Sequence, residues 1–311
     1  MIKYIRTILP LLLLFMAMGI KGQNIASANF ETDARTAGFA GAGVGLDANG
    51  MSLFRNTAGI LFSDNTLQAA YSFQALNGKN SFHTLGGYYK LNDKHALAFG
   101  VRYFWQDKYD LTDDGYTYTS FRPYDMMVDL AYARRMSDAF SLSLNLRCVF
   151  SKISNAPELD KLGSALAVDL GMNFRKESYS IAATLSNLGM LMDYGGDEFR
   201  MPAHAKVGGA YWWNIQQEHR ITASVEGRYN FLPSHEQFFS AGGGAEYCYK
   251  GLVAVRGGYH VGEKNKSAGN YATAGCGIYV GPVKADFSYT FADEDSSIMN
   301  NVWMVTAGIR F

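Results

Sequence analysis

The side chains best suited to catalysis or metal binding are few and scattered along this chain of 311 residues. They are Cys148, Cys248, Cys276, His83, His95, His204, His219, His235 and His260. No C-x-x-C pair or nucleophile motif surrounds any of them, and an odd, widely spaced set of cysteines indicates free structural thiols. His204 and His260 fall on polar strand faces, where a histidine satisfied by its neighbours is the common case. We therefore predict no catalytic residue, metal site, cofactor or enzymatic activity.

A glycine-rich stretch near the N-terminus could cradle a phosphate. Residues 33–49 read DARTAGFAGAGVGLDAN, with glycines at 38, 41, 43 and 45. This spacing does not match G-x-G-x-x-G, and no strand-turn-helix pattern surrounds it, so we reject nucleotide binding. Small residues permit close packing and unusual backbone angles. Residues 23–65, in which alternation is weak, are predicted to form a separate N-terminal plug segment.

A third set of polar side chains could form a hydrogen-bonded network. They share the polar faces of alternating segments, and they are Lys90, Arg102, Asp129, Arg147, Asp169, Arg175, Glu226, Arg228, Glu246, Arg256, Lys284 and Asp286. Their mixed signs do not suit a pore selective for anions or cations. They suit pairing with an inserted segment, to which Asp33, Arg35, Asp47 and Arg55 could contribute. The alternative, that these charges only solvate a water-filled interior, stays open.

The elements that carry these charges show the period of two that is typical of strands with one apolar and one polar face. In residues 283–291, for example, Val283, Phe287 and Phe291 lie on one side, while Lys284 and Asp286 lie on the other. Fourteen such segments are predicted, at 66–76, 81–91, 96–107, 124–136, 139–153, 165–176, 179–190, 203–214, 219–230, 238–250, 252–261, 270–280, 283–292 and 301–311.

The connections between these segments alternate between long and short. Residues 108–123, 154–164 and 191–202 are long, whereas 137–138 and 281–282 are tight. Every proline after residue 22 falls in a connection, where no ladder N–H is needed. Long loops on one rim and short turns on the other are typical of an outer-membrane barrel.

The apolar face decides between a membrane barrel and a soluble β-sandwich or barrel. About eight strands already leave an interior just filled by side chains, so fourteen would enclose too wide a lumen for an apolar core. We therefore predict an all-β transmembrane antiparallel barrel at residues 66–311, with its apolar face toward lipid and the plug segment in its lumen.

The first 22 residues are predicted to be a cleaved secretory signal peptide. Lys3 and Arg6 precede an apolar run from Ile8 to Ile20, and the small residue Gly22 marks the expected cleavage site. The run is too short for a spanning helix. Cleavage takes three of the 28 basic residues and none of the 28 acidic ones, so the mature chain carries about −3. Without a basic excess, no nucleic-acid partner is expected. The predicted location is the bacterial outer membrane.

The last segment resembles the C-terminal signal by which outer-membrane barrels are recognised by their assembly machinery. Its apolar stripe includes Trp303, Val305, Ile309 and Phe311. This resemblance implies the barrel assembly machinery as a partner, in addition to outer-membrane lipid.

The N-terminal region resembles that of PorV/PorQ-type proteins of the type IX secretion system and, more distantly, FadL/TodX-type hydrocarbon transporters. The resemblance implies a fourteen-stranded barrel with a plug or hatch. In that superfamily the last motif is usually Asn-Pro-Ala-Gly, and here Thr57 replaces the proline, which leaves the turn less rigid. The residues that carry the motif are Asp33, Arg35, Gly38, Gly41, Gly43, Asp47, Asn49, Arg55, Asn56, Ala58 and Gly59.

Two functions follow from this resemblance. The first is docking or shuttling of exported cargo, with secretion-system components or secreted proteins as partners. Aromatic residues of the long loops could bind them, although tyrosines near a membrane rim also form the ordinary interfacial girdle. They are Tyr109, Tyr116, Tyr118, Phe121, Tyr194 and Phe199, and Met192 accompanies them.

The second function is passive uptake of hydrophobic small molecules through a plugged barrel. It requires an apolar pocket between plug and wall. Its candidate lining residues, which could equally pack the plug against the wall, are Phe39, Leu46, Met51, Leu53, Phe54, Ile60, Leu61 and Phe62.

Overall fold

The computed structural model describes residues 26–76, 79–113, 116–153, 162–189, 191–193, 198–216, 218–233, 237–263, 269–292 and 299–311. The predicted signal peptide at residues 1–22 lies outside these described residues, as does the start of the predicted plug segment. Among the described residues, no helix is long and apolar enough to cross a membrane.

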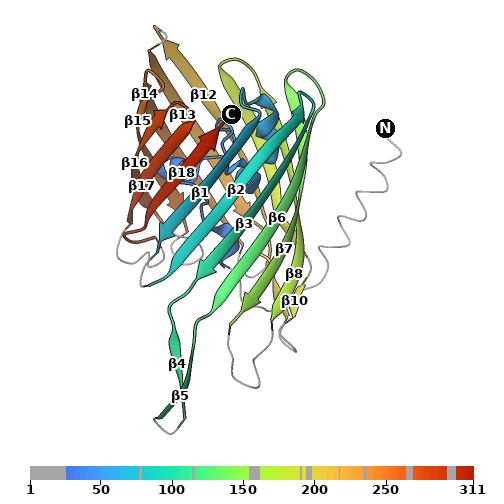
Figure 1. Cartoon of the computed structure of the whole chain (residues 1–311), viewed down its shortest axis with the longest axis vertical. Helices are drawn as coiled ribbons and strands as arrows, with labels where there is room; N and C mark the ends of the chain where they lie inside the picture. Colours follow the sequence, from blue (N-terminus) through green and yellow to red (C-terminus); the bar gives the residue numbers. More distant parts are fainter. Residues whose placement is uncertain are drawn as a thin grey trace, which may run out of the picture.

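Fourteen antiparallel strands close into a barrel (Figure 1), which confirms the predicted antiparallel β-barrel. β1 pairs with β18, and β8 pairs with β9, so that the sheet has no open edge in the ring. The strands are β1 (Leu67–Ala75), β2 (Ser81–Asn92), β3 (His95–Trp105), β6 (Tyr124–Arg135), β7 (Phe140–Lys152), β8 (Gly163–Arg175), β9 (Tyr179–Gly189), β12 (His204–Ile215), β13 (His219–Asn230), β14 (Phe238–Tyr249), β15 (Val253–Gly262), β16 (Tyr271–Val280), β17 (Val283–Ala292) and β18 (Trp303–Arg310).

Four further strands lie in connections that the sequence analysis treats as loops. β4 (Tyr109–Asp113) and β5 (Tyr116–Phe121) pair as a separate hairpin. β10 (Leu191–Asp193) and β11 (Glu198–Arg200) pair with each other, and β10 also contacts β8. The sequence Asp114–Gly115, followed by alternating Tyr and Thr residues, is a hairpin signal within this long connection.

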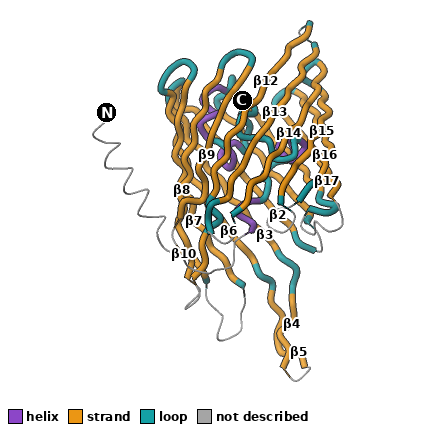
Figure 2. Tube along the Cα trace, turned by 180° about the vertical axis from the view of Figure 1, so that it is seen from behind, coloured by secondary structure: helices purple, strands orange, loops and turns teal. Residues whose placement is uncertain are grey.

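The two ends of the barrel differ. Tight connections such as Gly281–Pro282 lie at the end that also holds the C-terminus, which we call the short-turn end. The β4–β5 hairpin extends from the opposite, long-loop end, as Figures 1 and 2 show from two sides. The alternation of loop lengths in the sequence is therefore present in the fold.

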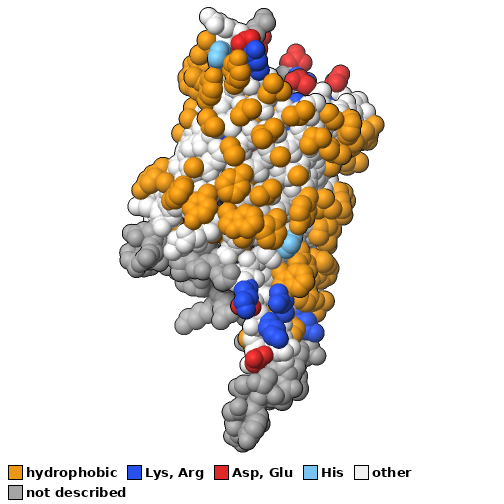
Figure 3. Space-filling view, turned by 60° about the vertical axis from the view of Figure 1, so that its left-hand side comes forward, with side chains coloured by type: hydrophobic (Ala, Val, Ile, Leu, Met, Phe, Trp, Pro, Cys, Tyr) orange, Lys and Arg blue, Asp and Glu red, His pale blue; other side chains and the backbone are white. Residues whose placement is uncertain are grey.

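The outer face of the wall is apolar (Figure 3), and the inner face is polar. On β17, Val283 and Phe291 are 51% and 56% exposed, whereas Ser288 and Thr290 are 2% and 3% exposed. Because side chains alternate across a strand, this division places the oily residues outside, as predicted.

Residues 26–65 lie within the barrel (Figure 2) and contain four short helices. They are η1 (Ala26–Asn29), α2 (Ala34–Gly38), α3 (Ser52–Arg55) and η2 (Thr57–Phe62). Leu53, Ile60 and Leu61 pack against small inward-facing alanines of β3 and β6, such as Ala96 and Ala133. The apolar core therefore lies between this N-terminal segment and the wall. The domain boundaries at 22/23 and 65/66 stay predictions.

Candidate functional site

A chain of ion pairs joins α2 to three strands of the wall. Arg35 Nη2 lies 2.8 Å from Glu246 Oε1, and Arg256 Nε lies 3.0 Å from Glu246 Oε2. Arg256 Nη2 in turn lies 2.8 Å from Asp286 Oδ1. Tyr279 donates its hydroxyl to the same Asp286 oxygen at 2.9 Å. Burial by itself would lower the pKa of Arg35, but Glu246 holds it well above its ordinary value. The segment is thus fixed to β14 by a charged pair away from bulk water.

Asp47 forms a second connection between the segment and the wall. Arg175 of β8 and Arg220 of β13 each place Nη2 2.6 Å from one of its two carboxylate oxygens. Burial alone would raise the pKa of Asp47, but the two guanidinium groups outweigh burial and lower it to about 2. Arg175 also stacks over the Trp212 ring at 4.3 Å. The loop after α2 is therefore held between strands on two sides of Asp47.

Backbone groups of the segment complete the contacts near β13. Gly43 and Val44 donate their N–H groups to Glu226 Oε2 at 3.0 and 2.8 Å. Lys206 Nζ lies 3.0 Å from the other oxygen of Glu226. One carboxylate thus receives two backbone N–H groups and a cation, which satisfies donors that would otherwise be buried unpaired.

Local hydrogen bonds shape the segment itself. Asp33 caps α2 by accepting the Thr36 N–H at 2.9 Å. Arg55 donates to the Asp47 carbonyl at 2.6 Å, and Asn56 accepts the Ala58 N–H at 3.1 Å. Gly41 has φ of +83°, a conformation that glycine adopts without strain. These polar residues of the predicted plug motif therefore hold the turns of the segment in place.

A third cluster of charges lies toward the long-loop end. Asp129 is fully buried, with Arg102 Nη2 3.1 Å from its Oδ2 and Arg147 Nε 2.7 Å from its Oδ1. Arg147 continues to Asp169 at 2.6 Å and also hydrogen-bonds Asn187. Glu31 of the N-terminal segment lines a small cavity of about 30 Å³ beside this cluster. Burial raises the pKa of Glu31 to about 7, and the nearby Glu226 and Asp33 act in the same direction.

A family model for the type IX secretion system protein PorV matches residues 24–237. The match spans more than half of the chain and includes nearly all of the N-terminal segment. The chain belongs to the PorV family. This confirms the resemblance that its N-terminal motif indicates.

Solved structures with the same fold as this PorV family chain include hydrocarbon transporters. The P. putida toluene transporter TodX has a TM-score of 0.65 and 11% identity, over 90% of this chain and 98% of TodX. The Ralstonia pickettii toluene transporter TbuX has a TM-score of 0.64 and 12% identity, over 90% and 98%. A Pseudomonas aeruginosa FadL homologue has a TM-score of 0.52 and 11% identity, over 90% of this chain and 98% of the homologue. At such identities the likeness shows the fold alone. A comparison with curated protein sequences gives no match.

The structure brings together most of the predicted luminal charges of this PorV family chain. Ten of the predicted charges take part in the contacts above or in related ones: Arg102, Asp129, Arg147, Asp169, Arg175, Glu226, Glu246, Arg256, Asp286 and Arg228, whose Nε donates to Asn230 at 2.8 Å. Lys90 Nζ donates to the Ser63 carbonyl at 2.5 Å. Lys284 forms no ion pair within the described residues.

Sequence reasoning missed several partners of these charges. Lys206 and Arg220 stand on inward-facing positions of β12 and β13, and Trp212 lies beneath both guanidinium groups of the Asp47 site. Asn145 links Asp129 and Asp169 at 2.9 and 3.1 Å. The alternation of the two strands could have identified both residues, because Trp212 shares a face of β12 with His204 and Lys206, and Arg220 shares a face of β13 with Glu226.

The described histidines hydrogen-bond or stack against neighbouring groups. His204 is buried and lies 3.2 Å from the Pro202 carbonyl oxygen, and His260 stacks on Tyr271. His95 Nδ1 lies 2.6 Å from the Tyr132 hydroxyl, and His219 Nδ1 lies 2.6 Å from the Tyr247 hydroxyl, each on a neighbouring strand. His235 lies outside the described residues. The three cysteines are free, and no group of metal-binding side chains stands among the described residues.

Of the predicted aromatic surface at the long-loop end, the structure describes the side chains of Tyr109 and Phe121. Tyr109 donates to the Ile153 carbonyl at 2.8 Å and packs edge-on against Phe121. Met192, in contrast, is fully buried against Met127, Val149 and Met201, so its expected place on a docking surface is wrong. The short β10–β11 hairpin turns this side chain inward. The described part of the structure does not include the side chains of Tyr116, Tyr118, Tyr194 and Phe199.

The apolar stripe of β18 faces outward. Trp303, Val305, Ile309 and Phe311 are 39%, 40%, 43% and 63% exposed. Their recognition by assembly machinery stays a prediction.

Proposed function

We propose that this chain is an outer-membrane component of the type IX secretion system that docks or shuttles exported proteins at the cell surface. The PorV match over residues 24–237 carries this proposal. Short turns face the periplasm in outer-membrane barrels, so the long-loop end would face outward. Contacts with cargo or with other secretion components would then form there.

The internal contacts favour binding over conduction of a protein. The N-terminal segment is ion-paired to β8, β13 and β14 through Arg35 and Asp47. Opening the lumen would break the largely buried Arg35–Glu246 pair and the two partly exposed pairs of Asp47. Separating the buried pair is costly because a charge is left uncompensated. These contacts therefore favour a closed barrel that binds its partners at the long-loop end.

The β4–β5 hairpin is the projecting element on which we place the docking surface. Its base is braced, because Tyr109 binds the Ile153 carbonyl and Lys152 lies 5.9 Å from the Phe121 ring. Arg122 stacks over Trp105 at 5.1 Å. A braced, aromatic base presents contact area at a small cost in conformational entropy.

Removing the hairpin tests this placement. Residues 108–122 would be replaced by a short glycine-serine turn, and the barrel recovered from outer membranes by affinity purification. We expect loss of co-purified secretion components and cargo while heat-modifiable migration, the sign of a folded barrel, is unchanged. A matched control replaces residues 264–268, in another long connection, by glycine and serine. Equal recovery of partners by both variants would overturn docking at the hairpin.

Uptake of hydrophobic molecules takes second place. The eight apolar residues considered for its pocket are largely packed against the wall: Phe39, Met51 and Ile60 are 0% exposed, and Leu53 is 3% exposed. Packing of this kind leaves little lining for a ligand. Deletion of the chain followed by a toluene uptake assay tests this function. A clear loss of uptake would favour a transport function over docking.

We also propose that residues 1–22 direct export and that the β18 stripe is recognised during barrel assembly. Outer-membrane lipid would then contact the apolar outer face. Replacing Phe311 by alanine should lower the amount of assembled barrel in outer membranes. A Val280→Ala variant, which shortens an equally outward-facing residue of β16, is the matched control.

A further inference from the structure

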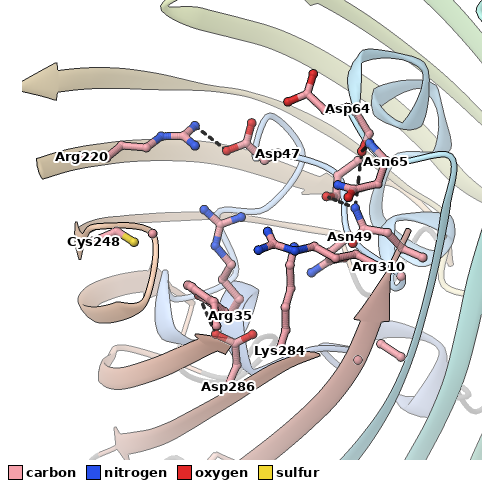
Figure 4. A pocket seen from close by; sticks show the side chains of 18 of the residues that line it. Arg35, Asp47, Asn49, Asp64, Asn65, Arg220, Cys248, Lys284, Asp286 and Arg310 are labelled. Carbon is pink, nitrogen blue, oxygen red and sulfur yellow. Dashed lines mark hydrogen bonds and ion pairs between the residues drawn. The ribbon is translucent and has the colours of Figure 1, made fainter. Parts of the chain in front are cut away.

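A cavity of about 700 Å³ lies at the short-turn end, between the N-terminal segment and the wall (Figure 4). Its lining reaches into the turns at Glu218 and Gly251. A volume of this size is within the range of small-molecule sites. No step of the proposed docking function uses this space.

The lining carries many charged side chains among its polar and apolar residues. Its six cations are Arg35, Arg175, Arg220, Lys250, Lys284 and Arg310. Its five carboxylates are Asp47, Asp64, Glu218, Glu246 and Asp286. Figure 4 shows Arg35, Lys284 and Arg310 pointing into the same space.

Most of these carboxylates already have cationic partners. Asp47 is shared by Arg175 and Arg220, and Glu218 pairs with Lys250 at the rim. Glu246 and Asp286 both bind Arg256, which stands behind the lining. Only the exposed Asp64 has no ion pair in the described structure. The carboxylates therefore do not neutralise the whole set of cations.

Lys284 and Arg310 are the unneutralised cations. Neither forms an ion pair within the described residues, and Arg310 donates only to the Gly281 carbonyl, at 3.2 Å from Nη2. On the other side of the cavity, Arg220 Nε is buried without a hydrogen-bond partner in the described residues.

We propose that this cavity binds an oxyanion, a carboxylate or phosphate group presented from the periplasmic side. Guanidinium forks and an ammonium group are the donors that recognise such groups, through charge-assisted hydrogen bonds. A bound oxyanion would compensate Lys284 and Arg310, which have no ion-pair partner among the described residues. The site is separate from the long-loop rim, so it does not depend on docking there.

Cys248 provides a reporter because it lines the same cavity. In a full-length Cys148→Ser, Cys276→Ser variant in detergent micelles, Cys248 would be modified by a sulfonate-bearing and by a trimethylammonium-bearing methanethiosulfonate. The ratio of the two rates reports local potential independently of how much thiolate is present. We expect the anionic reagent to react faster. Lys284→Met and Arg310→Gln should each lower the ratio about fivefold, from the Coulomb effect of one charge across a water-filled space.

Competition distinguishes the source of the oxyanion. Inorganic phosphate or acetate should slow the anionic reagent more than chloride at equal ionic strength does. Protection by phosphate alone supports a phosphate ligand, and protection by acetate alone supports a carboxylate. Isothermal titration of both anions into the native protein and into the Lys284→Met, Arg310→Gln double variant gives a second readout.

Two controls keep the test specific. Lys176→Met removes an exposed charge at the same end but outside the lining, and it should leave the rate ratio unchanged. Heat-modifiable migration checks that each variant is folded. The proposal is overturned if the native protein binds neither anion more tightly than the double variant does, or if chloride protects Cys248 as well as phosphate and acetate do.

Discussion

Arg35 of α2 and Glu246 of β14 form a bidentate ion pair, with Nε 3.1 Å from Oε2 and Nη2 2.8 Å from Oε1. The side chains are only 13% and 5% exposed. In such surroundings a charge that loses its partner is left uncompensated, which costs about 3–5 kcal/mol. This pair is therefore a sensitive point at which the N-terminal segment is held to the wall.

Glu246→Gln should lower the free energy of unfolding by about 3 kcal/mol or more, because Arg35 and Arg256 both lose the carboxylate. Urea titration in detergent micelles measures the change. Glu218→Gln is the matched control, since the Lys250–Glu218 pair has side chains that are 45% and 49% exposed. Exposed pairs contribute about 0–1 kcal/mol. Equal losses in both variants would show that the buried pair does not hold the segment.

Gly242→Ala should weaken docking of the N-terminal segment. A Cβ at Gly242 would lie 2.3 Å from the backbone oxygen of Ala40, so that one of the two backbones must move. Overpacking of this kind costs about 1–3 kcal/mol. Faster cleavage within residues 26–65 under limited proteolysis would report the displacement.

Gly257→Ala on the neighbouring strand is the control for that prediction. Its Cβ would meet its nearest atom, the Thr273 oxygen, at 3.6 Å, an ordinary contact. We expect no faster cleavage, because alanine restricts the unfolded chain and fits the space. Identical cleavage of both variants would contradict the close approach of Ala40 to β14.

Glu31→Gln should remove a loss of stability that develops as the pH rises from about 4.5 to 7. Burial raises the pKa of Glu31 to about 7 in the folded chain, from an ordinary value of 4.5. The stability tied to its protonated form is therefore complete below about pH 4.5 and is lost as the pH rises through 7. Nearby charges that act on it are Lys206, Glu226, Asp33 and Arg228.

The urea midpoints of the native chain and the Glu31→Gln variant should thus agree at pH 4 and separate at pH 8.5, with the variant more stable by about 1–3 kcal/mol. Asp64→Asn, which removes an exposed carboxylate of the same segment, should show no such separation. A native midpoint that does not fall relative to the variant between these pH values would refute the role of Glu31.

Thr57→Pro should be tolerated within about 1 kcal/mol. Asn56 is extended, with φ of −165° and ψ of 98°, as a residue before proline prefers. Thr57 begins η2, a position that proline favours, and loses only a 3.3 Å hydrogen bond to the Leu53 carbonyl. Ala58→Pro is the contrasting variant, because the Ala58 N–H donates to Asn56. Thermal unfolding should show a clear loss for Ala58→Pro alone, and a similar loss for both would contradict this account.

The alternation along the chain was sufficient to predict the wall. Successive side chains of a strand point to opposite faces. The alternation from Val283 to Phe291 therefore predicts which of these residues share a face, without knowledge of the neighbouring strands. The even number of segments and the alternating connections then predict the closed meander. Even the β4–β5 hairpin has a local signal at Asp114–Gly115, which its position in a long connection obscured.

Pairing of the luminal charges could not be predicted in the same way. Asp47 meets arginines 128 and 173 residues away, and Arg35 meets a carboxylate 211 residues away. Nothing in the local pattern chooses among a dozen inward-facing charges of mixed sign. The burial of Met192, opposite to expectation, likewise depends on how a long connection folds over the wall.

By itself, then, the amino-acid sequence determined the strands, their facing and the apolar outer surface, because these follow from geometry within each strand. Which ion pairs hold the N-terminal segment, and which cations, such as Lys284, have no ion pair among the described residues, depended on the folded arrangement. Those outcomes depend on closure of the barrel, which brings distant strands to opposite sides of one narrow space, and on the path that the segment takes through it.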